Sequence, residues 1–250
     1  MTTRPLFLLT NDDGHFAKGI RALRAALLPH ADVIICAPET EQSATSHSLS
    51  LHRPLRLREV EPGIHAVDGT PADCVYVALF ADARVLPRRP DLVVSGLNHG
   101  VNLGTDAFYS GTIGGAREAA LRGIPSLACS ADSKAERDAA AALSAQVALG
   151  LVDKKLRGLH NLNVPRGSGP WEVRGTILGS RQYSDQVSFI TDPRGREWLW
   201  IGTGVPSHEP VPETDTEAHD AGFASLSPLI LDLTDVAAVA AARVFAATIR

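Results

Sequence analysis

Short apolar segments alternate with amphipathic segments along the first half of the chain. The apolar run Leu6–Thr10 is typical of a buried strand, and Asn11–Gly14, directly after it, is typical of a turn. From Phe16 onward, apolar side chains recur every three or four positions, which predicts a helix. A second apolar run, Asp32–Ala37, predicts another buried strand, closed by Pro38. Strand, helix and strand in this order favour a parallel pair joined by a right-handed crossover.

The same alternation continues beyond this first unit. Further buried strands are predicted over Asp91–Ser95 and Pro125–Ser130. Helices are predicted over Pro71–Asp82, Gly114–Arg122 and Ala135–Val152. Regular alternation of strands and helices favours an α/β fold with a doubly wound, mostly parallel sheet.

After about residue 165 the segments become shorter and richer in β-branched and aromatic residues. The strands predicted in this part are Trp171–Leu178, Tyr183–Thr191, Glu197–Thr203 and Ala224–Leu233. Asp192–Gly195 is typical of a hairpin turn, Val205–Thr216 of a loop or arm, and Asp235–Ile249 of a helix. We therefore predict an α/β core over residues 1–165, and a hairpin extension, arm and C-terminal helix over residues 166–250, within one overall domain.

Composition limits which binding partners and which cellular compartment we expect. The formal net charge is −4, whereas a polynucleotide-binding domain usually carries a basic excess, so we expect no polynucleotide partner. A small phosphate ester stays possible, because local donors and a metal outweigh a mild global charge. The apolar stretch Leu6–Leu9 is too short for a signal peptide or membrane span, so we expect a cytoplasmic protein without a membrane partner. Cys36, Cys74 and Cys129 lie in apolar runs without zinc-like spacing and are expected to be reduced core thiols.

Two adjacent acids, Asp12 and Asp13, follow the first predicted strand. Ligands of open α/β sheets bind outside the carboxyl ends of the strands. Neighbouring carboxylates repel each other unless a cation lies between them or one is protonated, and oxygen ligands select hard cations such as Mg²⁺ or Mn²⁺. The backbone has to turn at Gly14 if both acids are to face one ion. The alternative is a solvated turn without a ligand.

Three further polar segments fall at the same predicted edge of the sheet. Residues 95–104 combine glycines with Asn98 and Asn102 after a buried strand, and amide groups bind either cations or phosphates. Residues 109–112 place small hydroxyl residues just ahead of a helix, which suits an anion, although helix capping also explains them. Residues 41–48 form a hydroxyl-rich loop. Each segment also has a bland explanation as a turn, a cap or a loop.

Other catalytic motifs are missing from the sequence. The chain has no GxSxG nucleophile elbow, no GKS or GKT phosphate loop, and no GxGxxG after the first strand. Four histidines near the polar segments are candidates for substrate contacts, with a surface role as the alternative: His15, His47, His52 and His99.

Taken jointly, these segments resemble the SurE family, the stationary-phase survival protein nucleotidases. The matching segments are LLTNDDG at 8–14, APETEQSATS at 37–46, DGTPADCV at 68–75 and the long run at 90–130, with weaker matches at 162–165 and 222–234. The resemblance implies a three-layer sandwich with an extended hairpin and a C-terminal arm that takes part in homodimer or homotetramer contacts. It also implies hydrolysis of nucleoside 5′- and 3′-monophosphates, sometimes with activity on short polyphosphate.

The resemblance further implies one divalent cation, Mg²⁺ or Mn²⁺, held by Asp12, Asp13, Ser43 and Asn98, with Asp12 and Asp13 as the catalytic acids. The implied phosphate contacts are Asn98, Ser110, Gly111 and Thr112. Two features depart from the family pattern: Ala44 stands where a glycine commonly follows the metal-binding serine, and residues 205–220 match only loosely.

Two other functions are compatible with parts of the sequence. A phosphatase with an aspartyl-phosphate intermediate usually needs a second acid two residues after the nucleophile, and position 14 is glycine. A non-enzymatic nucleotide-binding module would keep the glycine-rich phosphate segments but has no need of paired acids. Metal-assisted attack of water on a phosphomonoester is the mechanism that the whole pattern favours.

Overall fold

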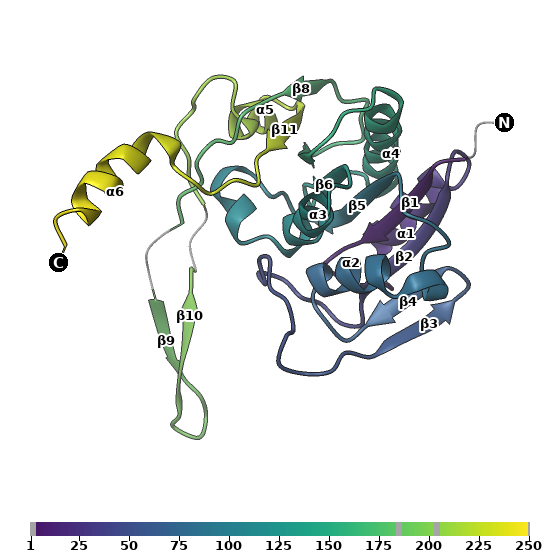
Figure 1. The fold of residues 1–250 in the computed structure, drawn as a ribbon, viewed down its shortest axis with the longest axis horizontal. Coiled ribbons are helices and arrows are strands. Elements are labelled where there is room, and N and C mark those ends of the chain that lie inside the picture. Colours follow the sequence, from purple (N-terminus) through teal and green to yellow (C-terminus); the bar gives the residue numbers. More distant parts are fainter. Residues whose placement is uncertain (1–3, 184–186, 203–205, 250) are drawn as a thin grey trace.

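A computed structural model describes residues 4–183, 187–202 and 206–249 of the 250-residue chain. Its centre is a nine-stranded sheet with the strand order β3-β4-β2-β1-β5-β6-β7-β11-β8 (Figure 1). The five central strands are β1 (Leu6–Thr10), β2 (Asp32–Pro38), β5 (Leu92–His99), β6 (Ser126–Ala131) and β7 (Leu159–Val164). They pair in parallel, which confirms the predicted mostly parallel α/β sheet.

The chain winds outward in both directions from β1. It passes first to β2 on one side and later crosses to β5 on the other, so the strand order reverses between β1 and β5. Reversals of this kind open a crevice at the carboxyl ends of the two strands. The topology therefore places residues that follow β1 beside residues at the end of β5.

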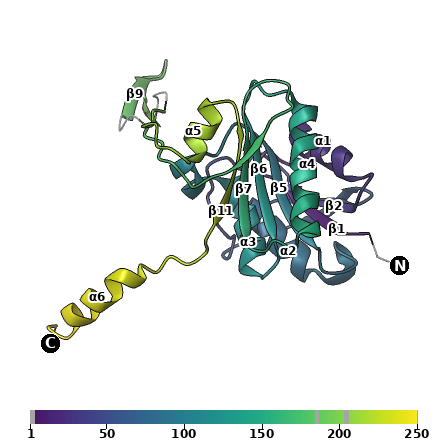
Figure 2. The same ribbon diagram turned by 90° about the horizontal axis from the view of Figure 1, so that it is seen from above.

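Two pairs of helices cover the two faces of the sheet (Figure 2). The helices α1 (Lys18–Leu27) and α4 (Arg137–Asp153) pack on one face, and α2 (Pro71–Phe80) and α3 (Gly111–Leu121) pack on the other. Alternate side chains of β1 serve the two layers, because Phe7 and Leu9 join the α1 side while Leu6 and Leu8 join the α2 side. The chain thus has the predicted three layers.

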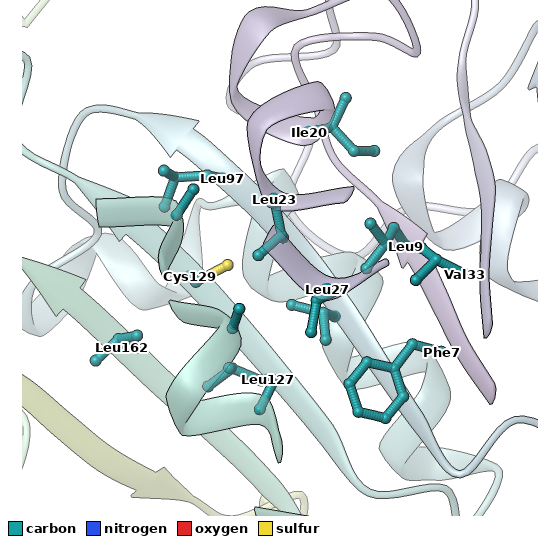
Figure 3. Close-up of a cluster of buried hydrophobic side chains, with 14 of the residues drawn as sticks. Phe7, Leu9, Ile20, Leu23, Leu27, Val33, Leu97, Leu127, Cys129 and Leu162 are labelled. Atoms are coloured by element: carbon teal, nitrogen blue, oxygen red, sulfur yellow. The ribbon is translucent and has the colours of Figure 1, made fainter. Parts of the chain in front are cut away.

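The larger core lies between the sheet and α1 (Figure 3). Ile20, Leu23 and Leu27 recur at helical spacing along α1 and are fully buried. They meet Phe7 and other side chains of the parallel strands. Burying one such aliphatic side chain stabilises the fold by about 1.5–3 kcal/mol. The three cysteines are buried and free, as expected from the sequence.

The remaining elements lie at the edges of the sheet and in the C-terminal part. They are β3 (Leu57–Glu61), β4 (Ile64–Val67), β8 (Val173–Gly175), β11 (Ala224–Leu229), a separate antiparallel hairpin of β9 (Val187–Thr191) and β10 (Glu197–Ile201), the short helix α5 (Asp215–Asp220) and α6 (Val239–Ala246). Short 3-10 turns occupy Asp82–Arg84, Gly104–Phe108 and Val236–Ala238. Figures 1 and 2 show that the hairpin and α6 stand away from the core.

Several predicted boundaries were wrong. Helix α3 begins at Gly111 instead of Gly114, because the side chain of Ser110 accepts a hydrogen bond from Ile113 N–H and caps the helix there. The predicted strand Trp171–Leu178 is reduced to three residues, and the predicted loop Val205–Thr216 runs into a helix that starts at Asp215. The last strand ends at Leu229, and the final helix at Ala246.

Three strands were missing from the prediction. The edge pair β3 and β4 and the parallel strand β7 were not predicted, since β3 is mostly exposed and β7 alternates apolar residues with Asn161 and Asn163. The hairpin and its turn at Asp192–Gly195 are confirmed for the described residues, while positions 184–186, 203 and 205 of the predicted segments lie outside them. The division at residue 165 stays a prediction. Within the described residues, none of the helices is both long and apolar enough to cross a membrane.

Two glycines in helices provide a matched test of the packing. A Cβ atom on Gly19 of α1 would lie 2.0 Å from the carbonyl oxygen of Leu97, whereas one on Gly150 of α4 would meet nothing within 4 Å. We expect Gly19→Ala to lower the free energy of unfolding by about 1–3 kcal/mol through overpacking. Gly150→Ala should raise it by about 0.5–1 kcal/mol, because alanine is the better helix former. Urea denaturation of both variants checks this, and equal effects would contradict it.

Candidate active site

The predicted site residues gather at the reversal between β1 and β5. Asp12 and Asp13 directly follow β1, Asn98 lies near the end of β5, and the two strands are paired at Thr10 and Ser95. A cavity of about 540 Å³ opens at this edge. Five of the seven predicted site residues line it: Asp12, Asp13, Ser43, Asn98 and Ser110. All four predicted cation ligands therefore border one space.

A sharp turn after β1 brings the two acids to the same cavity. Gly14 adopts φ +96°, in the region that favours glycine. The fully buried side chain of Asn11 donates from Nδ2 to the carbonyl oxygen of Gly14 over 2.9 Å and closes the turn. Asn11 is a structural residue that the sequence reasoning treated only as part of the turn. Its amide explains how two neighbouring side chains reach one space.

Asp12 is fixed by helix α3. One carboxylate oxygen accepts from the backbone N–H of Thr112 over 3.0 Å, and the other accepts from the Thr112 hydroxyl over 2.5 Å. The side chain is almost completely buried. Burial, with a smaller contribution from the neighbouring Asp13, raises the pKa of Asp12 to about 6 despite these hydrogen bonds. Asp12 therefore keeps its proton to a higher pH than a free aspartate does and is mainly neutral only below about pH 6.

Asp13 is half-buried, and its pKa is raised as well. Burial raises its pKa, the Glu41 carboxylate adds to the rise, and a hydrogen bond from the backbone N–H of His99 opposes it. Among the described residues, neither Asp12 nor Asp13 forms an ion pair with a lysine, arginine or histidine. The charge of His99 also lowers the pKa of Asp13, although burial outweighs it. Two adjacent carboxylates without an ion pair among the described residues fit a site whose main positive charge comes from a bound ion.

Ser43 reaches the cavity on a loop between β2 and β3. Its hydroxyl donates to Glu41 over 2.7 Å, and the preceding Gln42 N–H donates to the carbonyl oxygen of Asp12 over 2.7 Å. The next residue, Ala44, has φ +57°, a left-handed conformation that glycine adopts more easily. The loop therefore keeps a conformation that suits the glycine common in the family, although alanine stands at this position.

Asn98 presents an oxygen to the site. Its Nδ2 donates to the carbonyl oxygen of Gly100 over 2.8 Å. Among the described residues, no hydrogen bond engages its Oδ1, which is therefore the atom left for a cation. One amide hydrogen is already used, which reduces what Asn98 can offer to a phosphate.

At the start of α3, some polar groups stabilise the structure and others are available to a ligand. Ser110 caps the helix, which confirms the capping interpretation, and Thr112 directs both its donors to Asp12. The N–H of Gly111 has no acceptor in the part of the chain that the structure describes, so it is available to an anion. A Cβ on Gly111 would lie 3.0 Å from Asp12 Oδ2. Glycine thus lets the helix start approach the acid without crowding its carboxylate.

The next two glycines of α3 have a packing role. A Cβ on Gly114 would lie 2.2 Å from the carbonyl oxygen of Ser46, and one on Gly115 would lie 2.9 Å from the Thr10 side chain. The two glycines are therefore explained by close contact of α3 with the Ser43 loop and with β1.

Three residues of the cavity wall were missed by sequence reasoning. Asp106 forms an ion pair of 2.5 Å with Arg181 and accepts from the Tyr183 hydroxyl over 2.7 Å, and all three line the cavity. Burial and the neighbouring Asp106 carboxylate raise the pKa of Tyr183 to about 12, so this phenol stays a hydrogen-bond donor. No local signal predicts the cluster, because Asp106 is about 75 residues away from its partners in the sequence.

Of the four candidate histidines, His99 is the one that lines this cavity among the residues described. His47 instead binds Glu118 over 2.8 Å. A second cavity of about 390 Å³ shares Asp13, Asn98 and His99 with the first and extends past Leu97 toward Arg137. The two spaces meet at the predicted metal ligands.

The donor set contains few carboxylates. In the part of the chain described, no group of three or more His, Cys, Asp or Glu side chains could hold a metal. The predicted cation ligands include only two such side chains, Asp12 and Asp13. The other two ligands, Ser43 and Asn98, contribute neutral oxygens and are not counted in a group of this kind. An all-oxygen set of this kind suits Mg²⁺ or Mn²⁺.

Comparison with known proteins identifies the family. The profile of the family described as "Survival protein SurE" matches residues 7–185. The chain belongs to the SurE family. A relative in Sorangium cellulosum, named 5′-nucleotidase SurE, is 59% identical over 92% of this chain and 91% of its own length. Another relative of that name, in Geobacter metallireducens, is 44% identical over 93% of this chain and 94% of its own.

A solved SurE structure agrees with the fold. The crystal structure of SurE protein from Aquifex aeolicus matches with a TM-score of 0.84 and 34% identity, covering 97% of this chain and 100% of that one. The family resemblance and the α/β sandwich inferred from the sequence are both confirmed. None of these comparisons assigns roles to individual side chains, so the site residues stay predictions.

The raised pKa of Asp12 predicts an unusual effect of its removal. In the metal-free protein, the folded state holds the proton of Asp12 up to about pH 6, whereas an unfolded aspartate loses it near 3.8. Stability therefore falls as pH rises from about 4 through 6 and stays lower above that. Asp12→Asn removes this cost. Its Oδ1 can accept from the Thr112 N–H, and its Nδ2 can donate to the Thr112 hydroxyl, which reverses that hydrogen bond. We expect the variant to be more stable than wild type at pH 7.5 by about 2 kcal/mol, with no difference near pH 4.

Urea denaturation in EDTA at both pH values measures this difference. Asp91→Asn is the matched control at the opposite end of β5. Burial tends to raise the pKa of Asp91, but hydrogen bonds from Leu6 N–H and Arg88 outweigh it and lower the pKa overall. Asp91→Asn should therefore destabilise the protein at neutral pH, the opposite sign. Equal stability of wild type and Asp12→Asn at pH 7.5 would contradict the burial effect.

Proposed function

We propose that this chain is a metal-dependent phosphomonoesterase that hydrolyses nucleoside 5′-monophosphates to nucleoside and phosphate. The observation that carries the proposal is that Asp12, Asp13, Ser43 and Asn98 line one cavity, together with Ser110 just before helix α3. The relatives that share most of the sequence are named 5′-nucleotidases, which supports the substrate class. Activity on 3′-monophosphates and on short polyphosphate stays a prediction from the family resemblance.

The proposed cation is one Mg²⁺ or Mn²⁺ ion, held by Asp12, Asp13, Ser43 and Asn98. Bound there, it would offset charge on the phosphoryl group and lower the pKa of a water molecule. Asp12 is fixed in advance by Thr112, so its oxygens need little rearrangement to bind the ion. Asn98 contributes Oδ1, because its Nδ2 is already held by Gly100.

The protein groups around the phosphate act by orientation and electrostatics. The N–H of Gly111 and the Ser110 hydroxyl hold phosphate oxygens at the positive end of α3. Thr112 acts through Asp12, since both its donors are committed to that carboxylate. One of the two carboxylates, Asp12 or Asp13, accepts the proton of the attacking water. The Arg181 and Tyr183 wall is the proposed boundary for the nucleoside part of the substrate.

Phosphate release from a panel of nucleoside monophosphates, with EDTA, Mg²⁺ or Mn²⁺, tests the function. We expect metal-dependent release by wild type and a loss of about 100-fold or more in Asp12→Asn, as for removal of one preorganised charged group. Asp91→Asn, at the other end of the sheet, should retain turnover. Full activity in Asp12→Asn would remove Asp12 from the mechanism, and nucleotide binding without turnover in any metal would favour the non-enzymatic module.

We also propose that a second copy of the chain covers the hairpin and the C-terminal helix, giving a homodimer or homotetramer. Trp200 and Ile201 of β10 are 62% and 79% exposed, and Phe245 of α6 is 66% exposed. Apolar side chains gathered on projecting elements are typical of association surfaces.

Light scattering coupled to gel filtration tests the association. We expect Trp200→Ser together with Ile201→Ser to shift the wild-type oligomer to a smaller species, because buried aromatic anchors carry much of an interface's free energy. Leu51, between β2 and β3, is an apolar residue of similar exposure, 78%, outside the hairpin and α6. Leu51→Ser should therefore leave the mass of the oligomer unchanged. A monomeric wild-type protein would refute the proposal.

A further inference from the structure

The loop that carries Ser43 has a conformation that it cannot hold by itself. Between β2 and β3, residues 39–56 form no helix or strand. Within this loop, Ala44 and Ser46 have φ angles of 57° and 54°, which side chains with a Cβ rarely adopt. Backbone of this kind persists only where surrounding contacts hold it. The position of Ser43 therefore depends on what anchors residues 44–48.

Helix α3 provides the surface on which this loop lies. The N–H of Ser46 donates to the carbonyl oxygen of Tyr109 over 3.0 Å, just before the helix, and the hydroxyl of Ser46 donates to Phe108 over 2.7 Å. Gly114 lets the loop approach closely, since a Cβ there would lie 2.2 Å from the Ser46 oxygen. These contacts place His47 above the second turn of α3.

A buried acid receives His47. The Glu118 side chain is 1% exposed, and its Oε2 lies 2.8 Å from His47 Nε2. Its other oxygen, Oε1, accepts from Arg122 over 2.8 Å. Burial alone would raise the pKa of Glu118, but the hydrogen bonds from His47 and Arg122 outweigh it, so the pKa is lowered and the carboxylate is charged. A charged buried group with two partners is strongly destabilised when one partner is lost.

We propose that Glu118 is a positioning residue for the metal site, and that it fixes the Ser43 loop on α3 through His47. The inference rests on the proposed function, because it assigns Ser43 to the metal. Its significance is geometric: the same helix holds Asp12 through Thr112 and the Ser43 loop through Glu118. Two of the proposed ligands thus take their positions from one rigid element.

The two partners of Glu118 separate positioning from general stability. Arg122 binds the same carboxylate, its guanidinium also packs over Tyr76 and Phe80, and none of its side-chain hydrogen bonds among the described residues reaches the loop. If Glu118 had only a structural role, the loss of His47 and the loss of Arg122 should have the same effect. If Glu118 positions the Ser43 loop, only the loss of its contact with His47 should weaken metal binding. The informative set is therefore Glu118→Gln, His47→Gln and Arg122→Gln, each compared with wild type.

Calorimetric titration with Mn²⁺ measures the first effect. We expect the Kd for Mn²⁺ to rise about tenfold in Glu118→Gln and His47→Gln, the lower end of the range for groups that orient metal ligands, and to stay unchanged in Arg122→Gln. Hydrogen exchange followed by mass spectrometry gives a readout without metal. The amides of residues 42–48 should exchange faster in the first two variants than in wild type or Arg122→Gln.

The outcomes are distinguishable. Wild-type affinity for Mn²⁺ in both Glu118→Gln and His47→Gln overturns the inference, and so does an equal loss in Arg122→Gln. If Glu118→Gln fails to fold, the more exposed His47→Gln decides. If the wild type binds no Mn²⁺, the proposed metal site fails, and the exchange measurement decides the anchor alone: unchanged loop exchange in Glu118→Gln and His47→Gln overturns it.

Discussion

Burial of two adjacent carboxylates, Asp12 and Asp13, is the constraint around which the site is arranged. Both carboxylates lie at one sheet edge without an ion-pair partner among the described residues, and burial raises both pKa values. The fold tolerates this because Thr112 gives Asp12 two hydrogen bonds from the start of α3. The acid, the helix and the first strand are consequently fixed relative to one another. A bound cation would relieve the remaining electrostatic cost.

Helix α3 is poorly suited to form independently, and this follows from the same arrangement. Gly111, Gly114 and Gly115 weaken a helix by about 1 kcal/mol each relative to alanine. Each is needed because Asp12, the Ser43 loop or β1 lies too close for a Cβ. The helix is therefore maintained by its neighbours, and its neighbours depend on it. Local propensity and site geometry conflict at this point, as is common where a protein binds its ligand.

The sequence predicted the parts of the fold in which one pattern dominates. Fully apolar runs such as Leu6–Thr10 marked the parallel strands, and helical spacing marked α1. The position of Asp12 beside Asn98 followed from the rule that ligands bind at the carboxyl ends of strands. The strand β7 was missed because Asn161 and Asn163 interrupt its apolar pattern. Both are buried, and both amides donate to the carbonyl oxygen of Asn102. Such pairing is invisible until the sheet is assembled.

Contacts between distant segments were equally beyond the sequence. The ion pair of Asp106 with Arg181 joins the cavity wall across about 75 residues, and nothing near either residue indicates the other. Thr112 illustrates a subtler limit. Its residue type and place at a helix start suit a phosphate, and only the geometry shows that both its donors go to Asp12. Residue chemistry defines what a side chain can bind, and packing selects which partner it has.

The burial of all three cysteines has a consequence for how the hairpin can be labelled. Cys36, Cys74 and Cys129 lie in the interior, and burial raises the pKa of Cys129 to about 12 and that of Cys74 well above its usual value. Cys74 and Cys129 thus carry almost no thiolate, the reactive form, at neutral pH, and Cys36 is shielded by its burial. A single cysteine introduced at the exposed turn of the hairpin, at Arg194, would be the one readily alkylated thiol among the described residues. A fluorophore or spin label can then report on the hairpin without removal of any native cysteine.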